Sequence, residues 1–377
     1  MKKLLIIFLL YSSVIQAQEI NGTYRRYEGI IGKKAGVVVD LHFADTVVTG
    51  HYYYSSAGKE LLLNGSLKRG VLVLKESEAN AVTGLFNGTV AADFTQIDGT
   101  WTDAARSKTL PFTLASFLPE GSVNVKSLTK TFKYIWRSNS KGQTLGCKGT
   151  YTYCYLPESS VNPVARAINE SLLSFELEGD ETPAEVRDLA EESMEDEFDS
   201  FSESYEEAFP DSVAAENRQF MDESPYIYNW EYQQAYDVVY NEHYLMSVRV
   251  TGYTYTGGAH GNTVYSYMVL DLKTGETLTL DDLFLKSSKR ELAAIAEKQL
   301  RINRNIDESA SLKDNGLLIN KLDLNEAFYI DHGGIGFTYS PYEIAPYADG
   351  PINIYLQWEQ VKSLINPDGP IAWAISQ

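Results

Sequence analysis

The sequence predicts an α+β protein in which an all-β region, folded as a small barrel or a sandwich, precedes a region that mixes helices and strands. Three observations lead to this prediction. Short β-type segments separated by turns occupy residues 19–118, the first helix-start signal appears at Asn162, and β-type segments return from residue 217 onward. Because helices and strands follow no regular alternating unit, we expect α+β rather than a doubly wound parallel sheet.

The region 19–118 has the pattern of an antiparallel meander. Its β-type segments recur about every ten residues and are separated by Gly or Asn-Gly turns, as in consecutive hairpins. These segments are 36–43, 47–54, 60–67, 71–76, 81–86, 98–102 and 110–114. We therefore expect an up-and-down barrel or sandwich of about eight strands. A barrel mouth could hold a small apolar ligand, although small barrels are more often filled by their own side chains.

Three helices with recognisable start signals are expected after the β region. Asn162 and Pro163 fit the N-cap and first turn of one helix. Thr182 and Glu185 have the spacing of a capping box that begins a second helix, and residues 288–291 have the same spacing for a third that ends near residue 305. Apolar side chains of the second helix recur every three or four residues. They are Val186, Leu189, Ala190, Met194, Phe198, Phe201, Tyr205 and Phe209.

The first residues have the layout of a secretory signal peptide. A basic start is followed by an apolar run at 4–10 and by Ala17 at the expected cleavage position, and the run is shorter than the ~20 residues that span a membrane. No Cys follows the run, so no lipoprotein signal is expected, and no later segment is apolar enough to cross a membrane. We predict a signal peptide at 1–17 and an exported, soluble protein in the periplasm or outside the cell.

Changes in composition divide the remainder of the chain into three predicted domains. An all-β domain is expected at 19–118, an α+β domain at 123–235 and a second α+β domain at 236–377. The first boundary falls near Gly121, after the last turn of the meander, where the strand spacing changes.

The two cysteines are expected to form a disulfide in an exported protein. Cys147 and Cys154 flank a segment in which Lys148 and Gly149 could form a turn and bring two strands together. An oxidising compartment would then favour a disulfide that closes this loop. The alternative is a pair of free buried thiols. A metal site is not expected, because no His or further Cys lies near the pair.

The charge balance restricts the class of partner. The chain has 32 Lys and Arg against 51 Asp and Glu, a formal net charge of −19. Such acidity excludes a typical nucleic-acid binder, whose surface would carry a basic patch. Sixteen acidic residues and one Arg lie between 176 and 211, mostly on the second predicted helix. They could form a solvated helix face, or a field that attracts a cationic protein.

No complete catalytic motif is present, and we expect neither enzymatic activity nor a cofactor. The five histidines have no recognised metal-ligand spacing; His42 and His51 lie on neighbouring predicted strands. The best candidate for catalysis is His260, in a Gly-rich loop where the backbone could approach a ligand. A turn in which His260 bonds to the backbone or to a nearby tyrosine is the simpler interpretation.

Two later segments resemble a known family. The segment 252–282, which contains Gly257-Gly258-Ala259-His260-Gly261, and the segment 337–350 resemble the carboxy-terminal domain of RsiV-like anti-sigma factors. The preceding stretch, with Tyr153-Cys154-Tyr155-Leu156-Pro157, Asn169 and the strand pair at 236–250, resembles the domain that precedes it there and in PdaC-type peptidoglycan deacetylases. The resemblance covers roughly 125–375 and leaves 19–118 outside.

The resemblance implies a non-catalytic extracytoplasmic module, which in the best-understood relatives is a receptor for lysozyme. Lysozyme is strongly cationic, in keeping with the acidic second helix. Two features of the relatives are absent from this sequence: a transmembrane helix with its sigma-binding segment, and the metal-dependent catalytic module of the deacetylases. Membrane signalling and deacetylation are therefore not carried over to this chain.

A partner-binding surface is predicted in the two RsiV-like segments. Tyrosine and proline provide rigid contact area, and tyrosine is enriched at binding hot spots. The expected contact residues are Pro341, Tyr342, Glu343, Pro346 and Tyr347, with Tyr255 and His260 beside them. The alternative is that these residues stabilise the fold, with Gly257, Gly258 and Gly261 forming a turn and the tyrosines packing a loop across the sheet.

Three functions are compatible with these observations. The favoured one is an exported binding protein of the bacterial cell envelope that recognises lysozyme, another cationic protein or a cell-wall glycan. The second is an envelope enzyme that acts on peptidoglycan or another glycan through the loop of His260. The third is a carrier that holds a small ligand in the N-terminal β domain.

Overall fold

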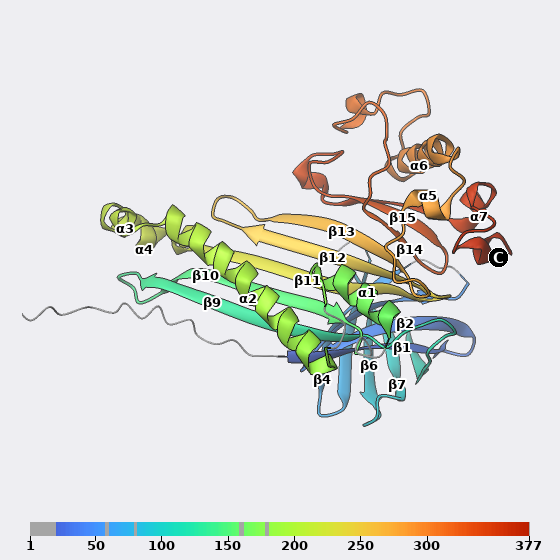
Figure 1. The fold of residues 1–377 in the computed structure, drawn as a ribbon, viewed down its shortest axis with the longest axis horizontal. Coiled ribbons are helices and arrows are strands. Elements are labelled where there is room, and N and C mark those ends of the chain that lie inside the picture. The colour runs from blue at the N-terminus through green and yellow to red at the C-terminus, as the bar shows by residue number, and fades with distance from the viewer. Residues whose placement is uncertain (1–19, 57–59, 79–80, 158–161, 178–180, 377) are drawn as a thin grey trace, which may run out of the picture.

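The structure is a computed structural model that describes residues 20–56, 60–78, 81–157, 162–177 and 181–376. The predicted signal peptide, residues 1–17, lies outside the described residues. No helix in the described part of the chain is long and apolar enough to cross a membrane. The architecture is mostly β, with a barrel first and a helix-containing α+β region after it, as predicted (Figure 1).

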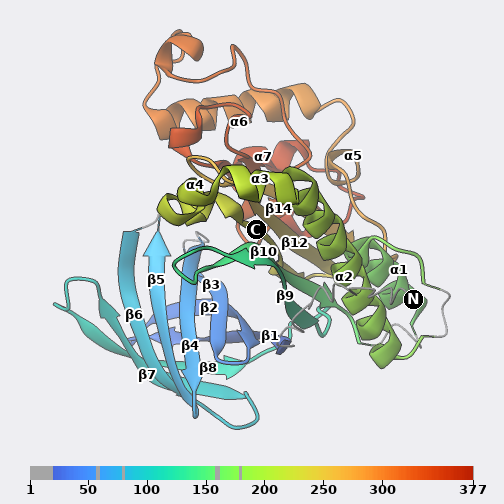
Figure 2. The same cartoon turned by 90° about the vertical axis from the view of Figure 1, so that its left-hand side faces the viewer.

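The N-terminal region is a closed eight-stranded barrel (Figure 2). Each strand pairs antiparallel with the next, and β1 also pairs with β8, so that Tyr27 faces Ser116 and Ile31 faces Phe112. The predicted meander is therefore closed as a barrel and is not a sandwich. The strands are β1 (Ile20–Ile31), β2 (Ala35–Ala44), β3 (Val47–Tyr54), β4 (Leu61–Lys68), β5 (Val71–Glu78), β6 (Ala81–Val90), β7 (Gln96–Asp103) and β8 (Thr109–Ser116).

Large side chains pack the inside of the barrel. Tyr52 and Phe86 have no more than 2% of their surface exposed, and their rings meet edge to face at 5.4 Å. Phe86 meets Phe112 in the same way at 5.3 Å. The buried Glu76 accepts hydrogen bonds from the Tyr52 hydroxyl at 2.7 Å and from the Trp101 indole at 2.6 Å. These contacts give the small barrel a core of its own side chains.

Strand β1 joins the barrel to a five-stranded sheet. Its first residues, from Ile20 to Thr23, pair with β9, whereas Tyr27 to Ile31 pair with β8. The sheet continues through β9 (Lys126–Ser138), β10 (Thr144–Tyr155), β11 (Asn229–Glu242), β12 (Leu245–Tyr255) and β13 (Asn262–Asp271). Only the β10–β11 pair of this sheet is parallel, because the chain crosses over through helices between these two strands.

Two helices cover one face of the five-stranded sheet (Figure 1). The Asn162 side chain caps α1 (Pro163–Leu173), and the capping box of Thr182 and Glu185 begins α2 (Pro183–Ala208), both as predicted. The predicted apolar face of α2 packs on β9 and β10; for example, Phe198 stacks on Phe132 at 5.4 Å. Short helices α3 (Asp211–Glu216), α4 (Arg218–Glu223) and η1 (Pro225–Tyr228) then lead into β11.

The C-terminal unit packs on the opposite face of that sheet. On β12, Met246 and Val248 belong to the core under the helices, whereas Ser247 between them hydrogen-bonds the carbonyl of Ile330 at 2.9 Å. The unit contains a small sheet of β14 (Phe328–Ile330), β15 (Gly334–Tyr339) and β16 (Ile352–Gln357). Its helices are α5 (Leu280–Leu283), α6 (Lys289–Arg304), η2 (Lys313–Asn315), η3 (Tyr347–Asp349), α7 (Trp358–Val361), η4 (Lys362–Leu364) and η5 (Ala372–Ser376).

Helix α6 begins where predicted but without the predicted capping box. Ser288 precedes the helix in a helical backbone conformation and forms no side-chain cap. Its hydroxyl donates instead to the carbonyl of Leu285 at 2.6 Å, and its helical backbone angles differ from the extended conformation that an N-cap residue normally adopts. The predicted division of the chain at 235/236 falls inside β11, between two residues of one continuous strand.

The predicted disulfide is wrong, because Cys147 and Cys154 are both free and buried. No turn forms at Lys148 and Gly149; β10 runs straight through them from Thr144 to Tyr155. Seven residues of extended chain place the two thiols on the order of 23 Å apart, well beyond the reach of a disulfide. They also point to opposite faces of the strand. The alternative of two buried thiols holds.

Candidate functional site

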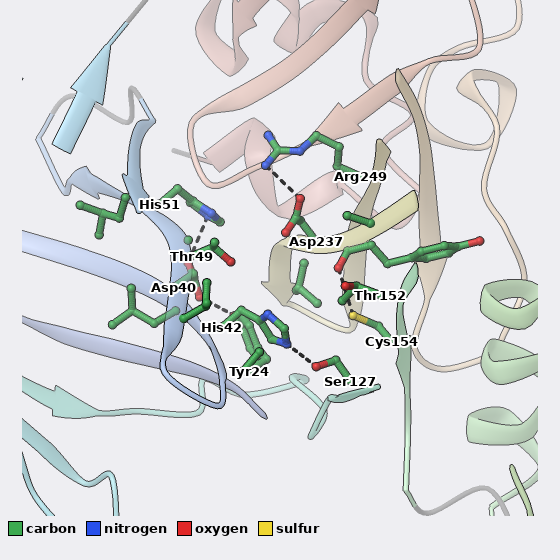
Figure 3. A pocket seen from close by; sticks show the side chains of 18 of the residues that line it. Tyr24, Asp40, His42, Thr49, His51, Ser127, Thr152, Cys154, Asp237 and Arg249 are labelled. Carbon is green, nitrogen blue, oxygen red and sulfur yellow. Dashed lines mark hydrogen bonds and ion pairs between the residues drawn. The ribbon is translucent and has the colours of Figure 1, made fainter. Parts of the chain in front are cut away.

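A cavity of about 490 Å³ lies between the outside of the barrel and the five-stranded sheet (Figure 3). We call it the barrel–sheet cavity. Strands β2, β3 and β4 form most of one wall, to which Tyr24 of β1 and Ser77 of β5 contribute. Strands β9, β10, β11 and β12 form the other wall. The volume lies within the ~300–1,000 Å³ typical of small-molecule sites.

Strand alternation places polar side chains on the barrel wall of the cavity. Side chains of a strand point alternately to its two faces. On β2, Leu41 points into the barrel core while Asp40 and His42 point outward; on β3, Tyr52 points inward while Thr49 and His51 line the cavity. These strands therefore pack apolar and aromatic side chains inside the barrel and present titratable side chains outside it.

The same alternation divides β10 between the helices and the cavity. Tyr151 and Tyr153 belong to the core under α2, whereas Thr152 and Cys154 face the cavity. The Cys154 thiol donates to the carbonyl of Tyr236 at 3.3 Å. Burial raises the pKa of this thiol, so it is neutral and unreactive at neutral pH.

A chain of alternating charges crosses the cavity wall, and Figure 3 shows its members Asp40, His51, Asp237 and Arg249. His51 Nε2 lies 3.4 Å from a carboxylate oxygen of Asp40, and its Nδ1 lies 3.8 Å from Glu60. Arg249 then lies 3.9 Å from Glu60 and 3.4 Å from Asp237. The Asp40 carboxylate also accepts a hydrogen bond from the Tyr24 hydroxyl. Three strands of the barrel and two of the sheet thus contribute to one network.

The network sets the charge states of its buried members. Burial lowers the pKa of His51, but Glu60 and the hydrogen bond to Asp40 raise it more, to about 8. Burial raises the pKa of Asp40, but its hydrogen bond and attraction to His51 hold it below the usual range. At neutral pH the pair is therefore imidazolium and carboxylate.

A second histidine in the cavity contacts a serine but lacks the remainder of a nucleophilic triad. His42 Nε2 hydrogen-bonds the Ser127 hydroxyl, and burial lowers the pKa of His42, so the ring is neutral. No described carboxylate pairs with its other nitrogen, and Ser127 has 1% of its surface exposed. A Cβ on Gly22 would fall 2.1 Å from the Ser127 hydroxyl oxygen, so β1 packs directly over the pair. The contact fits a structural role better than acyl transfer, which requires an oriented base and an accessible nucleophile.

The arrangement offers no metal centre among the described residues: no group of three or more His, Cys, Asp or Glu side chains is placed to hold an ion. Charged groups of the cavity pair with one another instead. Chemically, the cavity can bind a small polar molecule through hydroxyl, amide, carboxylate and guanidinium groups.

The barrel, the sheet and the C-terminal unit meet beside this cavity. Arg26 of β1 donates to Glu242 of β11 at 2.8 Å, and Tyr53 of β3 stacks on His332 at 5.6 Å. Burial raises the pKa of Asp331 to about 7. The Arg26–Glu242 bond ties the sheet to the barrel, and the Tyr53–His332 contact ties the C-terminal unit to the barrel. Together they fix the relative position of the cavity walls.

The structure brings the predicted partner-binding residues together at a different place. Tyr347 stacks on His260 with ring centroids 3.8 Å apart and packs at a tilt against Tyr342 at 5.5 Å. Its hydroxyl donates to the carbonyl of Gly261 at 2.7 Å. Tyr255 donates to the carbonyl of Gly258 at 3.1 Å within the same loop. We call this group, His260, Tyr342 and Tyr347, the aromatic stack.

The members of the predicted surface differ in accessibility. Tyr342 has 56% of its surface exposed, and Pro346 and Glu343 are exposed as well. The Glu343 carboxylate is engaged in its own loop, where it accepts from the Ser340 amide and from Asn325, both at 2.8 Å. His260 Nδ1 lies 2.9 Å from the carbonyl of Gly261. Much of this group therefore holds the loops together, and Tyr342 presents the main free aromatic area.

Sequence reasoning missed the barrel–sheet cavity. It placed His42 and His51 on neighbouring strands but assigned them no role. The alternation Asp40-Leu41-His42, polar outside and apolar inside, was a usable signal for an outer polar wall. The opposite wall could not be inferred, because it comes from β9 to β12, more than eighty residues later.

Two family models match separate parts of the chain. Residues 143–263 match the deacetylase PdaC family, and residues 281–359 match a family of proteins of unknown function, DUF3298. The sequence resemblance is thus confirmed for these two domains, while neither match bears the RsiV name. Comparison with curated proteins finds no match.

A solved structure of a DUF3298 protein shares the fold, and a second is less similar. A member from Bacteroides fragilis NCTC 9343 is 23% identical with a TM-score of 0.51, and the match covers 66% of this chain and 97% of that one. A DUF3298 protein from Pseudomonas aeruginosa PAO1 is 16% identical with a TM-score of 0.42, covering 65% and 95%. The first likeness supports the architecture described above.

Proposed function

We propose that this protein is a non-catalytic binding protein of the bacterial cell envelope that holds a small molecule in the barrel–sheet cavity. The cavity itself carries the proposal: it has the volume of a ligand site and walls from two separate folding units. Location in the envelope is supported by the predicted signal peptide and by the PdaC and DUF3298 matches.

The chemistry of the walls favours binding over catalysis. Its strongest potential base, His51, is held between two carboxylates and is protonated at neutral pH. The neutral His42 hydrogen-bonds Ser127, which is covered by β1. A general base needs an available lone pair within reach of its substrate, and a nucleophile needs an exposed oxygen. Neither condition is met by these two histidines.

A substitution that fills the cavity tests the proposal. Ala235 of β11 lines the cavity, and Ala235→Trp places an indole in it. Gln233 is two residues away on the same strand face but outside the cavity and exposed, so Gln233→Trp is the matched control. Thermal unfolding of the three proteins is measured with a panel of amino acids, sugars, polyols and organic acids. A ligand at 100 times its Kd stabilises the folded state by about 2.7 kcal/mol.

We expect at least one compound to raise the Tm of the wild type and of Gln233→Trp by a few degrees and to leave Ala235→Trp unchanged. A compound that stabilises all three proteins equally would bind elsewhere. If no compound of any class raises the Tm of the wild type, the proposal fails.

The aromatic stack favours a second function, recognition of a cationic protein such as lysozyme. Tyr342 is exposed beside Tyr347, as in rigid aromatic contact sites. Helix α2 adds a strongly negative surface, on which the exposed carboxylates are Glu185, Asp188, Glu192, Glu195, Asp196, Asp199, Glu203, Glu206 and Glu207.

Titration calorimetry of residues 18–377 with a c-type lysozyme at two salt concentrations tests this second function. Attraction between exposed charges is screened by salt, so binding should weaken at the higher concentration. Tyr342→Ala should weaken it further, and Tyr226→Ala, which removes a tyrosine of equal exposure at 56%, should not. Absence of heat at both concentrations rules out lysozyme as the partner.

A further inference from the structure

Two opposite charges lie side by side on the sheet wall of the barrel–sheet cavity. Asp237 on β11 and Arg249 on β12 are cross-strand partners whose side chains both point into the cavity (Figure 3). Their closest atoms are 3.4 Å apart, and Arg249 lies 3.9 Å from its other partner, Glu60. Charged hydrogen bonds between such groups are ordinarily about 2.7–2.9 Å long. The guanidinium and the carboxylate therefore retain bonding capacity toward the cavity.

Their exposure agrees with this spare capacity. Within the folded chain, the side chain of Arg249 is 22% exposed and that of Asp237 is 33% exposed. A guanidinium has five N–H donors in a planar fork, which can hold a carboxylate through two parallel bonds. An aspartate beside it can accept two or more hydrogen bonds from an ammonium group. The pair thus presents a donor site and an acceptor site next to each other.

The barrel wall opposite adds groups without side-chain partners. Among the described residues, Thr49, Asn64 and Ser77 line the cavity and form no side-chain hydrogen bond. Leu62 and Val47 line the same cavity and are about half exposed, at 45% and 50%. This wall could accommodate a side chain of mixed polarity.

The charge balance of the cavity excludes a simple ion as its best occupant. Three cations in or beside the cavity, His51, Arg249 and Lys126, are balanced by three anions, which are Asp40, Glu60 and Asp237. An anionic ligand would face two carboxylates, and a cationic ligand would face a guanidinium and an imidazolium. In a zwitterion of the α-amino-acid type, one carbon carries both the ammonium group and the carboxylate. Such a molecule would match Asp237 and Arg249, because cross-strand neighbours have Cβ atoms only about 4.5–5.5 Å apart.

We propose that the barrel–sheet cavity binds a zwitterion of the α-amino-acid type, with its carboxylate on Arg249 and its ammonium group on Asp237. The side chain of the ligand extends toward Thr49 and Asn64 on the barrel wall. This inference rests on the proposed function and specifies the ligand class of the same cavity. The half of the site on the barrel lies outside both segments matched by the family models.

Calorimetric titration of residues 18–377 at pH 7 with each of the twenty free L-amino acids tests the inference. The amino acid that binds is titrated again as its N-acetyl derivative, which lacks the ammonium group, and as its methyl ester, which lacks the carboxylate. Loss of either charged group should weaken binding by about 100-fold, because hydrogen bonds between charged groups are stronger than neutral ones. At 1.4 kcal/mol per tenfold, this loss is about 2.8 kcal/mol. A hydroxyl-rich neutral molecule, such as glucose, is titrated in parallel.

A double variant removes both charges of the wall without leaving one unpaired. Asp237→Asn with Arg249→Gln keeps the approximate shape and the neutrality of the pair, because removing one partner alone would bury an uncompensated charge. The matched control is Lys148→Gln with Glu231→Gln, a cross-strand ion pair of 3.5 Å outside the cavity. We expect the double variant to lose binding and the control to retain it.

Four results would overturn the inference. Equal binding of the free and the blocked amino acid would show that the charged groups are not recognised. Equal loss in the double variant and in the control would show a general effect on the sheet. Binding of glucose or another neutral compound in place of every amino acid would refute the zwitterion while leaving the proposed function intact; failure of all compounds would refute both.

Discussion

Replacing His51 with glutamine should change how the free energy of unfolding depends on pH. This change measures the charge network that joins the barrel to the sheet. In the folded protein His51 faces the carboxylates of Asp40 and Glu60 and, beyond them, the guanidinium of Arg249. Burial disfavours the imidazolium, but the two carboxylates favour it more strongly, and the pKa is about 8 against 6.5 for an exposed histidine. Glutamine retains a polar side chain of similar length and cannot titrate.

The size of the effect follows from that difference in pKa. A shift from 6.5 to about 8 is roughly 1.5 pKa units, and one unit corresponds to 1.36 kcal/mol, so protonated His51 contributes about 2 kcal/mol to stability. Because the pKa is raised in the folded state, this contribution is complete below pH 6.5. It disappears as the pH rises through about 8.

Urea unfolding of the wild type and of His51→Gln between pH 6 and pH 9 measures the contribution. We expect the wild type to lose about 2 kcal/mol more than the variant over this range. Asp331, with its pKa raised to about 7, also reduces stability as the pH rises, but it does so in both proteins and cancels in the difference. Thr49→Val, a substitution beside His51 that does not titrate, should follow the wild type. An identical pH dependence in wild type and His51→Gln would refute the proposed charge network.

Two further predictions concern the barrel closure and the thiols. Gly29→Ala should destabilise the protein by about 1–3 kcal/mol in urea unfolding, because its Cβ would lie 1.9 Å from the carbonyl oxygen of Thr113 on β8. Gly252→Ala, with no atom within 4 Å of the added Cβ, is the control, and an equal effect of both would argue against the β1–β8 seam. Cys147 and Cys154 should both react with a thiol reagent only after unfolding in urea without reductant; fewer than two thiols per chain would indicate a disulfide.

Elements governed by neighbouring residues were predicted well from the sequence. The caps of α1 and α2 depend on side chains three or fewer positions apart, and the structure confirms both. The apolar face of α2 depends only on helical periodicity, and Val186, Met194 and Phe198 are buried as expected. The meander also followed from local turn signals, but its closure depends on the pairing of β1 with β8, which no local pattern specifies.

The error at β10 has a physical cause in packing. Gly149 resembles a turn residue, yet a Cβ there would fall 2.7 Å from ring atoms of Phe198 and Tyr151, so glycine provides room for α2 against the strand. The actual turn lies at 139–143, where Asn139 bonds the amides of Lys141 and Gln143 at 3.1 and 2.9 Å. A glycine in a strand and a glycine in a turn have the same local sequence signal.

The candidate site was harder to predict than the fold. The Tyr347 hydroxyl bonds Gly261, 86 residues earlier, and its ring stacks on His260; the aromatic character of this group could be anticipated from the resemblance. The barrel–sheet cavity joins the outside of β2–β4 to β9–β12, and its position is set by the way β1 divides its pairing between β8 and β9. Such a junction depends on tertiary packing, which sequence patterns do not specify.

Equilibrium dialysis against a mixture of radiolabelled free amino acids at pH 7 tests the central claim most directly, because it counts the ligand held per chain. The wild type and Gln233→Trp should retain close to one equivalent of one amino acid, and Ala235→Trp, with its cavity filled, should retain none. Equal retention by all three proteins would contradict binding in the barrel–sheet cavity, and no retention by the wild type would contradict a zwitterion as its ligand.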